Sequence, residues 1–120
     1  MSSKYKKIKY ATEKNVAQYL EKVDLEYKPQ FPVCVIDEDD NIRIWHPDFY
    51  LPRLGLFLEV CGSERYKKKY DYRQKIYKKN GIRVVFLHYW KNESDWKNFL
   101  WTEISSIERD RVNESKKLKT

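Results

Sequence analysis

The sequence predicts one α/β domain with a mixed central sheet flanked by helices. Three observations support this fold class. Helical and strand patterns follow the order α-β-β-β-α-β, with an extra helix near the C-terminus. The run Gly-Leu-Phe-Leu-Glu-Val-Cys over 55–61 is almost continuously apolar, as is typical of a buried central strand. A helical pattern separates this run from the next apolar strand, which predicts a parallel β-α-β pair. The 120 residues fit one domain.

The first half of the chain contains one expected helix and three expected strands. Apolar residues recur every three or four positions from Thr12 to Val23, which predicts an amphipathic helix. Two strands are expected over 33–37 and 42–50, joined by an acidic turn. The third strand is the apolar run over 55–61, which follows the interruption at Pro52.

The second half begins with a basic helix over 63–79, which Asn80 and Gly81 are expected to end because both tolerate a left-handed backbone. A fourth strand follows over 82–87, and an apolar stripe ending at Ile107 predicts a final helix. The domain organisation expected from these patterns is a basic N-terminal arm over 1–9, a single domain over 10–109 and a polar C-terminal tail over 110–120.

The positive charge is concentrated in one segment. The chain carries 25 Lys and Arg against 18 Asp and Glu, a formal net charge of +7. Residues 63–91 hold ten basic and two acidic residues, so the rest of the chain is close to neutral. This distribution favours a polyanionic partner, although a solvated helix face is the alternative interpretation. The residues expected to contact the phosphates of such a partner are Arg65, Lys67, Lys68, Lys69, Lys78 and Lys79.

Several protein classes do not fit the composition. No apolar run approaches the roughly 20 residues of a membrane helix, and the charged first residues do not resemble a signal peptide. Cys34 and Cys61 are too few for a disulfide framework, and we interpret both as small buried hydrophobic residues. The expectation is a soluble, cytoplasmic protein with no membrane partner.

Two acidic residues lie in segments that otherwise predict buried strands. They are Asp48, near the end of the second strand, and Glu59, inside the third. A buried carboxylate requires a cation, hydrogen bonds or a raised pKa. Hard divalent metals such as Mg²⁺ bind such oxygen ligands. The alternatives are that Asp48 caps a turn and that Glu59 pairs with a basic residue of the following helix.

These residues carry a resemblance to a known family. Pro47-Asp48, eleven residues before Glu59-Val60-Cys61-Gly62, resembles the signature of the PD-(D/E)XK nuclease superfamily. The chain is similar to small members related to very-short-patch repair endonucleases and Holliday junction resolvases, and the spacing of Tyr70, Arg73, Tyr77 and Gly81 adds to this similarity. The resemblance implies a restriction-endonuclease-like α-β-β-β-α-β core.

The resemblance also implies roles for individual residues. Asp48 and Glu59 would bind Mg²⁺, for which Mn²⁺ may substitute, together with the Val60 carbonyl. Glu13 matches an additional acid that many members place near the metal, with a solvated helix-face glutamate as the alternative. The Lys expected two residues after the second acid is Cys61 here. Some relatives supply this charge from the next helix, which points to Arg73 first and to Lys75 second as catalytic residues.

The sequence contains two histidines, His46 and His88. His46 could serve as a further ligand or base, but packing beside Trp45 is the favoured interpretation, and His88 is assigned no role. The function that the resemblance implies is a Mg²⁺-dependent endodeoxyribonuclease. It would select DNA structure rather than sequence, in repair or recombination, and would act as a homodimer. The alternative is a catalytically impaired nucleic-acid-binding module or a subunit of a larger repair or restriction complex.

Overall fold

The computed structural model describes residues 11–89 and 95–119 and contains a mixed four-stranded sheet. Its strands, in spatial order, are β1 (Lys28–Pro29), β4 (Phe49–Leu51), β5 (Leu56–Cys61) and β6 (Val84–His88). β4 pairs antiparallel with both β1 and β5, whereas β5 and β6 are parallel. The predicted α/β class, the mixed sheet and the parallel β-α-β pair are therefore confirmed.

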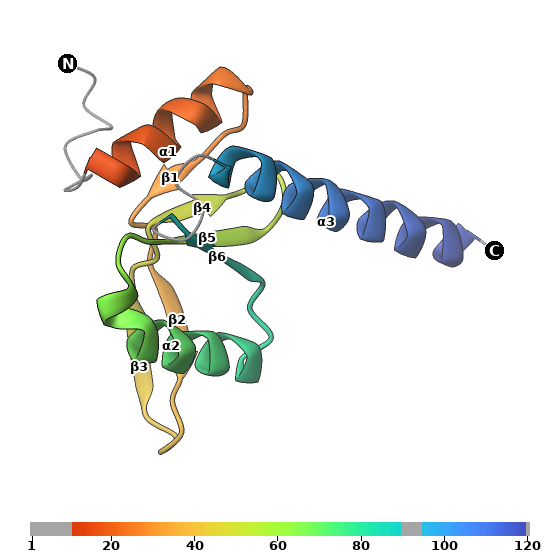
Figure 1. Cartoon of the computed structure of the whole chain (residues 1–120). Helices are drawn as coiled ribbons and strands as arrows, with labels where there is room; N and C mark the ends of the chain where they lie inside the picture. The colour runs from red at the N-terminus through yellow and green to blue at the C-terminus, as the bar shows by residue number, and fades with distance from the viewer. Residues whose placement is uncertain (1–10, 90–94, 120) are drawn as a thin grey trace.

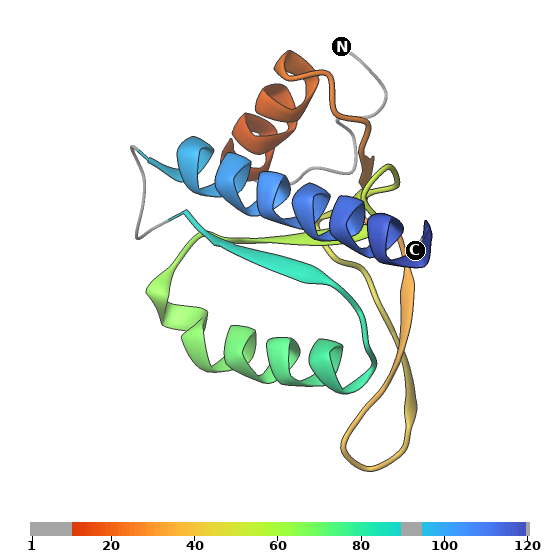
Figure 2. The same cartoon turned by 90° about the vertical axis from the view of Figure 1, so that its right-hand side faces the viewer.

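Helices cover both faces of this sheet (Figures 1 and 2). α1 (Ala11–Lys22) and α3 (Trp96–Lys119) lie on one face, and α2 (Lys67–Lys79) lies on the other. The core divides accordingly. The larger cluster joins α1 and α3 to the sheet, and the smaller one includes Ile76 and Tyr77 of α2.

Strand β5 separates the two clusters by alternation of its side chains. Leu56, Leu58 and Val60 belong to the cluster under α1 and α3. Cys61 belongs to the cluster under α2, and Glu59 points to the same side, where it contacts Tyr77. Burial on both faces explains why this strand is a nearly continuous apolar run, with one acid in it.

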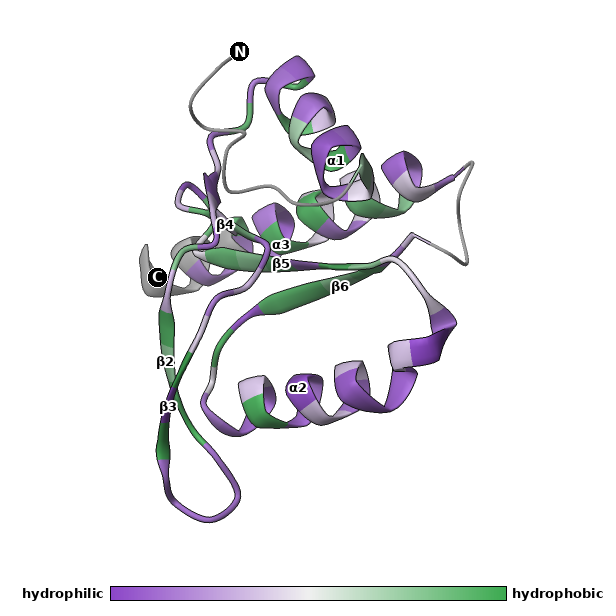
Figure 3. Ribbon diagram, turned by 90° about the vertical axis from the view of Figure 1, so that its left-hand side faces the viewer, coloured by the Kyte–Doolittle hydropathy of each residue, from purple (hydrophilic) through white to green (hydrophobic). Residues whose placement is uncertain are grey.

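The expected strand over 42–50 is wrong as a single element. The structure divides it into β3 (Ile42–Trp45) and β4, which belong to different sheets. Pro47 lies between them, and a proline cannot donate a hydrogen bond to a strand ladder. β3 instead pairs antiparallel with β2 (Val33–Ile36), forming a hairpin that lies beside α2 (Figure 3).

One face of this hairpin is exposed, which also corrects the expectation for Cys34. Cys34 is exposed opposite Ile44, and Ile36 is exposed opposite Ile42. The other face packs Val35 against α2, where this side chain is fully buried. Cys61 is buried as expected.

The helix boundaries agree with the sequence at α2 and differ at α3. The side chain of Ser63 caps a short 3-10 helix, Glu64–Tyr66, that leads into α2. Gly81, at a φ of 66°, follows the end of α2 as expected. α3 continues well beyond Ile107, to Lys119, so the expected polar tail is helical over most of its length. No Gly or Pro interrupts residues 96–119, which favours this continuation. The expected N-terminal arm, 1–9, lies outside the described residues.

The side chain of Asn80, at the end of α2, forms hydrogen bonds to the β2–β3 hairpin and to the helix. Its side-chain oxygen accepts a hydrogen bond from the Ile36 N–H, and its Nδ2 donates to the Ile36 and Ile76 carbonyls, all at 2.8–2.9 Å. Asn80→Ala is expected to lower the free energy of unfolding by about 1–3 kcal/mol, because it leaves these groups without their partner. Urea unfolding measures the change. Gln74→Ala, at an exposed position of α2, is the control, and an equal loss in both variants would contradict this role.

Candidate active site

The two acids predicted from the sequence lie side by side at the β4–β5 pair. Asp48 directly precedes β4, and Glu59 lies in β5. The Asp48 N–H donates to Glu59 Oε1 at 3.3 Å, and Asp48 Oδ2 accepts from the Val60 N–H at 2.7 Å. These two hydrogen bonds fix both carboxyl groups relative to the same strand. Asp48 therefore bonds across the sheet and does not act as a local turn cap.

Glu13 brings a third carboxyl group to this place. It is a buried residue of α1, with 7% of its surface exposed, so the solvated helix-face alternative is wrong. Its carboxyl group hydrogen-bonds that of Asp48. Burial, followed by the charge of Glu13, raises the pKa of Asp48 to about 7. The raised pKa favours a protonated Asp48 carboxyl group, hydrogen-bonded to Glu13, at pH values below about 7.

Glu59 is paired with the basic helix on its other side. Its Oε2 accepts from Arg73 Nε at 2.7 Å and lies 2.6 Å from Arg73 Nη2. The Tyr77 hydroxyl donates to the same oxygen at 3.0 Å and accepts from Arg73 Nη2 at 3.0 Å. Burial raises the pKa of Glu59, and the Arg73 guanidinium opposes that effect. Glu59 therefore pairs with a basic residue of the following helix, which was the alternative interpretation of this acid.

Arg73 also contacts an aromatic ring of the hairpin. Its guanidinium carbon lies 4.7 Å from the centroid of the Trp45 ring, within the range of a cation–π interaction. The Trp45 and Tyr77 rings meet edge to face at 5.2 Å. Arg73 is thus enclosed between a carboxylate and two rings, with 19% of its side chain exposed.

Lys75 is not brought to the acids. It is exposed, and two residues along an α-helix correspond to a rotation of about 200° from Arg73. Cys61, which occupies the position of the family's lysine, is fully buried. Burial raises the pKa of its thiol to about 12, so the thiol is neutral at physiological pH. Arg73 is therefore the predicted catalytic cation that the structure places at the carboxyl groups.

The predicted DNA-contacting residues divide into two groups along α2. Arg65 and Lys67 to Lys69 are exposed at the start of the helix, which follows the carboxyl end of β5. Lys78 and Lys79 lie about 16 Å further along the helix. Lys79 Nζ donates to the Asp37 carbonyl of the hairpin at 2.6 Å, so this lysine has a structural contact. The first group lies nearer to the residues that follow Glu59.

Several side chains differ from what the sequence indicated. His46 is exposed, so its expected packing beside Trp45 is wrong. Tyr66 lies seven residues before Arg73, a spacing that predicts a shared helix face, yet Tyr66 is 47% exposed. Sequence reasoning gave no role to Trp45 or to the Tyr77 hydroxyl. The spacing of four residues between Arg73 and Tyr77, which places both on one helix face, was the available signal.

Asp48 and Glu13 present two carboxyl groups in mutual contact, and carboxylate oxygens are ligands that hard divalent cations bind. Glu59 differs, because Arg73, Tyr77 and the Asp48 N–H already contact its two oxygens. The Val60 N–H contacts Asp48, while the role expected for its carbonyl stays a prediction. Within residues 11–89 and 95–119, no group of three or more His, Cys, Asp or Glu side chains is arranged to hold a metal ion.

Comparisons of the chain with protein-family models, curated proteins and solved structures give no match. The assignment of a function therefore depends on the geometry of the site. In the part of the chain that the structure describes, no helix is long and apolar enough to cross a membrane.

Proposed function

We propose that this protein is a metal-dependent endodeoxyribonuclease with a restriction-endonuclease-like fold, related to the PD-(D/E)XK superfamily. The observation that carries the proposal is the pair of hydrogen bonds that joins Asp48 to Glu59 and Val60 of β5, beside the buried carboxyl group of Glu13. Burying several carboxyl groups together costs folding free energy, and such clusters are typical of functional sites. The helices and main-sheet strands follow the order α1, β1, β4, β5, α2, β6, an α-β-β-β-α-β arrangement that supports the relationship.

The residues that would hold Mg²⁺ or Mn²⁺ are Asp48, Glu59 and Glu13, with the Val60 carbonyl as a fourth ligand. A bound divalent cation supplies charge that polarises a phosphodiester and lowers the pKa of an attacking water. The Val60 N–H holds Asp48 in place for this role. Loss of the proton shared by Asp48 and Glu13 would leave both groups as anionic oxygen ligands.

Arg73 would supply the positive charge that Cys61 lacks. An arginine stays protonated at all physiological pH values, so it stabilises negative charge on a phosphate but does not donate or accept the proton itself. The exposed basic residues Arg65 and Lys67 to Lys69 would position the DNA backbone, which gives affinity without sequence specificity. We therefore propose selection of a branched or nicked DNA structure, by a cytoplasmic homodimer that presents one site to each strand.

The proposal is tested by incubating the protein with supercoiled plasmid and with a four-way DNA junction in Mg²⁺ or Mn²⁺. We expect cleavage by the wild-type chain and no product above the enzyme-free background with Asp48→Ala or Glu59→Ala. Asp40→Ala is the matched control because Asp40 is an exposed acid of the hairpin turn. Equal cleavage by all four proteins would identify a contaminating nuclease and overturn the assignment.

One observation favours a second function. Both oxygens of Glu59 already have partners within the chain, namely Arg73, Tyr77 and the Asp48 N–H. This arrangement suits a module that binds nucleic acid without cleaving it, alone or as a subunit of a repair or restriction complex. Such a module would bind DNA equally well in EDTA and in Mg²⁺, with a steep dependence of affinity on salt, and would give no product in the cleavage assay.

A further inference from the structure

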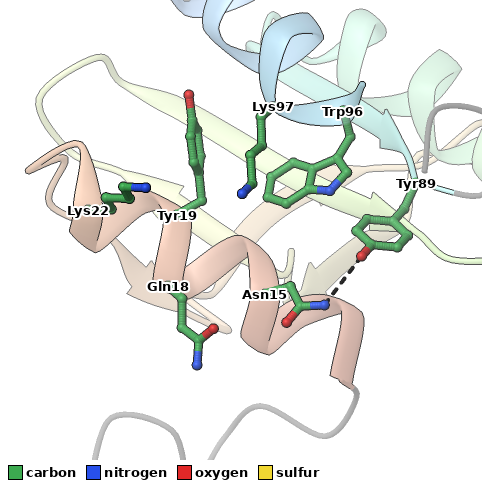
Figure 4. Close-up of a pocket in the computed structure, with 7 residues that line it drawn as sticks. All are labelled: Asn15, Gln18, Tyr19, Lys22, Tyr89, Trp96 and Lys97. Atoms are coloured by element: carbon green, nitrogen blue, oxygen red, sulfur yellow. Dashed lines mark hydrogen bonds between the residues drawn. The ribbon is translucent and has the colours of Figure 1, made fainter. Parts of the chain in front are cut away.

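A pocket lies between α1 and α3, and none of its lining residues belongs to the carboxyl cluster (Figure 4). Its volume is about 300 Å³. Four residues of α1, two of α3 and one that follows β6 line it, namely Asn15, Gln18, Tyr19, Lys22, Trp96, Lys97 and Tyr89. Helix α1 therefore contributes to two separate sites, with Glu13 at one and these four residues at the other.

The lining combines cations, amides and aromatic rings, with no carboxyl group. Lys97 Nζ lies 5.7 Å from the Tyr19 ring centroid and 5.6 Å from that of Trp96, between the two rings (Figure 4). Among the described residues, no carboxylate forms an ion pair with Lys97 or Lys22. Aromatic rings hold the Lys97 ammonium without neutralising it, so its charge stays available to an anion.

An adjoining groove extends the pocket along α3. It is lined by Tyr19, Val23, Lys97, Asn98 and Trp101, and it shares Tyr19 and Lys97 with the pocket. Trp101 is 51% exposed, and it lies four residues after Lys97 on the same helix face. An exposed indole next to an ammonium offers a stacking surface beside a charge, and every nucleobase has a face that stacks on such a ring.

We propose that the pocket between α1 and α3 binds a nucleotide, with its base on Trp101 and Tyr19 and its phosphate at Lys97 and Lys22. The lysines select an anion and the rings select a planar group. The Asn15 Nδ2 donates to the Tyr89 hydroxyl at 3.3 Å, which leaves the Asn15 amide oxygen for a polar edge of the ligand (Figure 4). The volume falls within the range of small-molecule sites. The same chemistry is presented by a free mononucleotide and by one unpaired nucleotide of a strand. This inference does not depend on cleavage at the carboxyl cluster.

Calorimetric titration of the full chain in EDTA tests the site. The probes are deoxyadenosine monophosphate and a short oligodeoxyadenylate, with inorganic phosphate and deoxyadenosine as partial ligands. We expect each nucleotide probe to bind at least about tenfold more tightly than either partial ligand, because only the nucleotides engage both the lysines and the rings. Equal affinity for the two nucleotide probes assigns the site to a free nucleotide, and tighter binding of the oligomer assigns it to an unpaired strand.

Variants on α3 locate the binding. Lys97→Ala and Trp101→Ala are each expected to weaken binding about tenfold. Arg109→Ala and Val112→Ala are the matched controls, since both residues are exposed on the same helix, and Arg109 lies about 18 Å from Lys97 along its axis. Absence of saturable binding, or an equal loss for Lys97→Ala and Arg109→Ala, would overturn the proposal. Plasmid cleavage by Lys97→Ala is expected to equal that of the wild type, which separates this site from the proposed nuclease site.

Discussion

Replacing Arg73 with alanine is expected to lower the free energy of unfolding by about 3 kcal/mol at pH 8, because the substitution leaves Glu59 buried without its cation. Glu59 Oε2 has Arg73 Nε at 2.7 Å and Nη2 at 2.6 Å, and the glutamate side chain is only 8% exposed. The Tyr77 hydroxyl and the Asp48 N–H still donate to the carboxylate, but neither carries a charge. The variant also loses the contact of the guanidinium with the Trp45 ring.

Urea unfolding of the Arg73 variant is compared with that of Lys75→Ala. Lys75 is exposed on the same helix, so its removal is expected to change the stability by no more than about 0.5 kcal/mol. The double variant Arg73→Met with Glu59→Gln removes both charges, and we expect it to be more stable than Arg73→Ala. Losses of equal size in Arg73→Ala and Lys75→Ala would show that the ion pair contributes little.

The destabilisation expected for Arg73→Ala depends on pH. Burial already raises the pKa of Glu59 above its ordinary value of 4.5, and removal of the guanidinium raises it further. A carboxyl group whose pKa is raised in the folded state is protonated in both states below its unfolded-state pKa. In that pH range its burial costs the least folding free energy. The destabilisation by Arg73→Ala is therefore smallest near pH 4 and grows as the pH rises through the folded-state pKa of Glu59.

The features of the fold that could be predicted are those set by residues close together in the sequence. The apolar run of β5 reports burial on both faces, and its single acid is visible against that background. Asp48 directly precedes β4 and Glu59 lies in β5, and these adjacent antiparallel strands are joined by a short loop, so the proximity of the two acids follows from local pairing. The end of α2 could also be predicted, because Gly81 adopts the left-handed backbone that only a few residue types accept.

The remaining features depend on contacts between distant segments. The apolar alternation of Ile42 and Ile44 is the same for a strand in the main sheet and for a strand in a separate hairpin, so it could not show that β3 pairs only with β2. Helical spacing places Arg73 on one face with Tyr70 and Tyr77, but this spacing could not identify Glu59 as the partner of Arg73. Glu13 precedes the buried residues Val16, Ala17 and Leu20 by three, four and seven positions, so helical spacing places it on the buried face of α1. That it meets Asp48 there depends on how α1 crosses the sheet.

Replacing Asp48 with asparagine is expected to abolish cleavage and to stabilise the fold by about 3 kcal/mol at pH 8. Asparagine keeps a side-chain oxygen for the Val60 N–H and offers an amide donor to Glu13 in place of the shared proton. The pKa of Asp48 is about 7 in the folded protein, above its ordinary value of 3.8, so the folded state binds the proton more tightly than the unfolded state does. The contribution of Asp48 to wild-type stability is therefore most favourable at low pH and becomes less favourable as the pH rises towards and through 7.

Unfolding curves from pH 5 to pH 8 distinguish this explanation from a general effect of removing charge. The Asp48→Asn variant is expected to lack most of the wild-type decline, whereas Asp40→Asn, at a carboxylate whose side chain is 91% exposed, is expected to retain it. Addition of Mg²⁺ at pH 8 should stabilise the wild-type chain by mass action and leave Asp48→Asn unchanged, because a cation that binds the ionised carboxyl groups binds only the folded site. An Asp48→Asn chain that is less stable than the wild type at pH 8 without metal would contradict the repulsion between Asp48 and Glu13. A gain in stability together with a loss of cleavage would instead show that the buried acids reduce stability and are required for the chemistry.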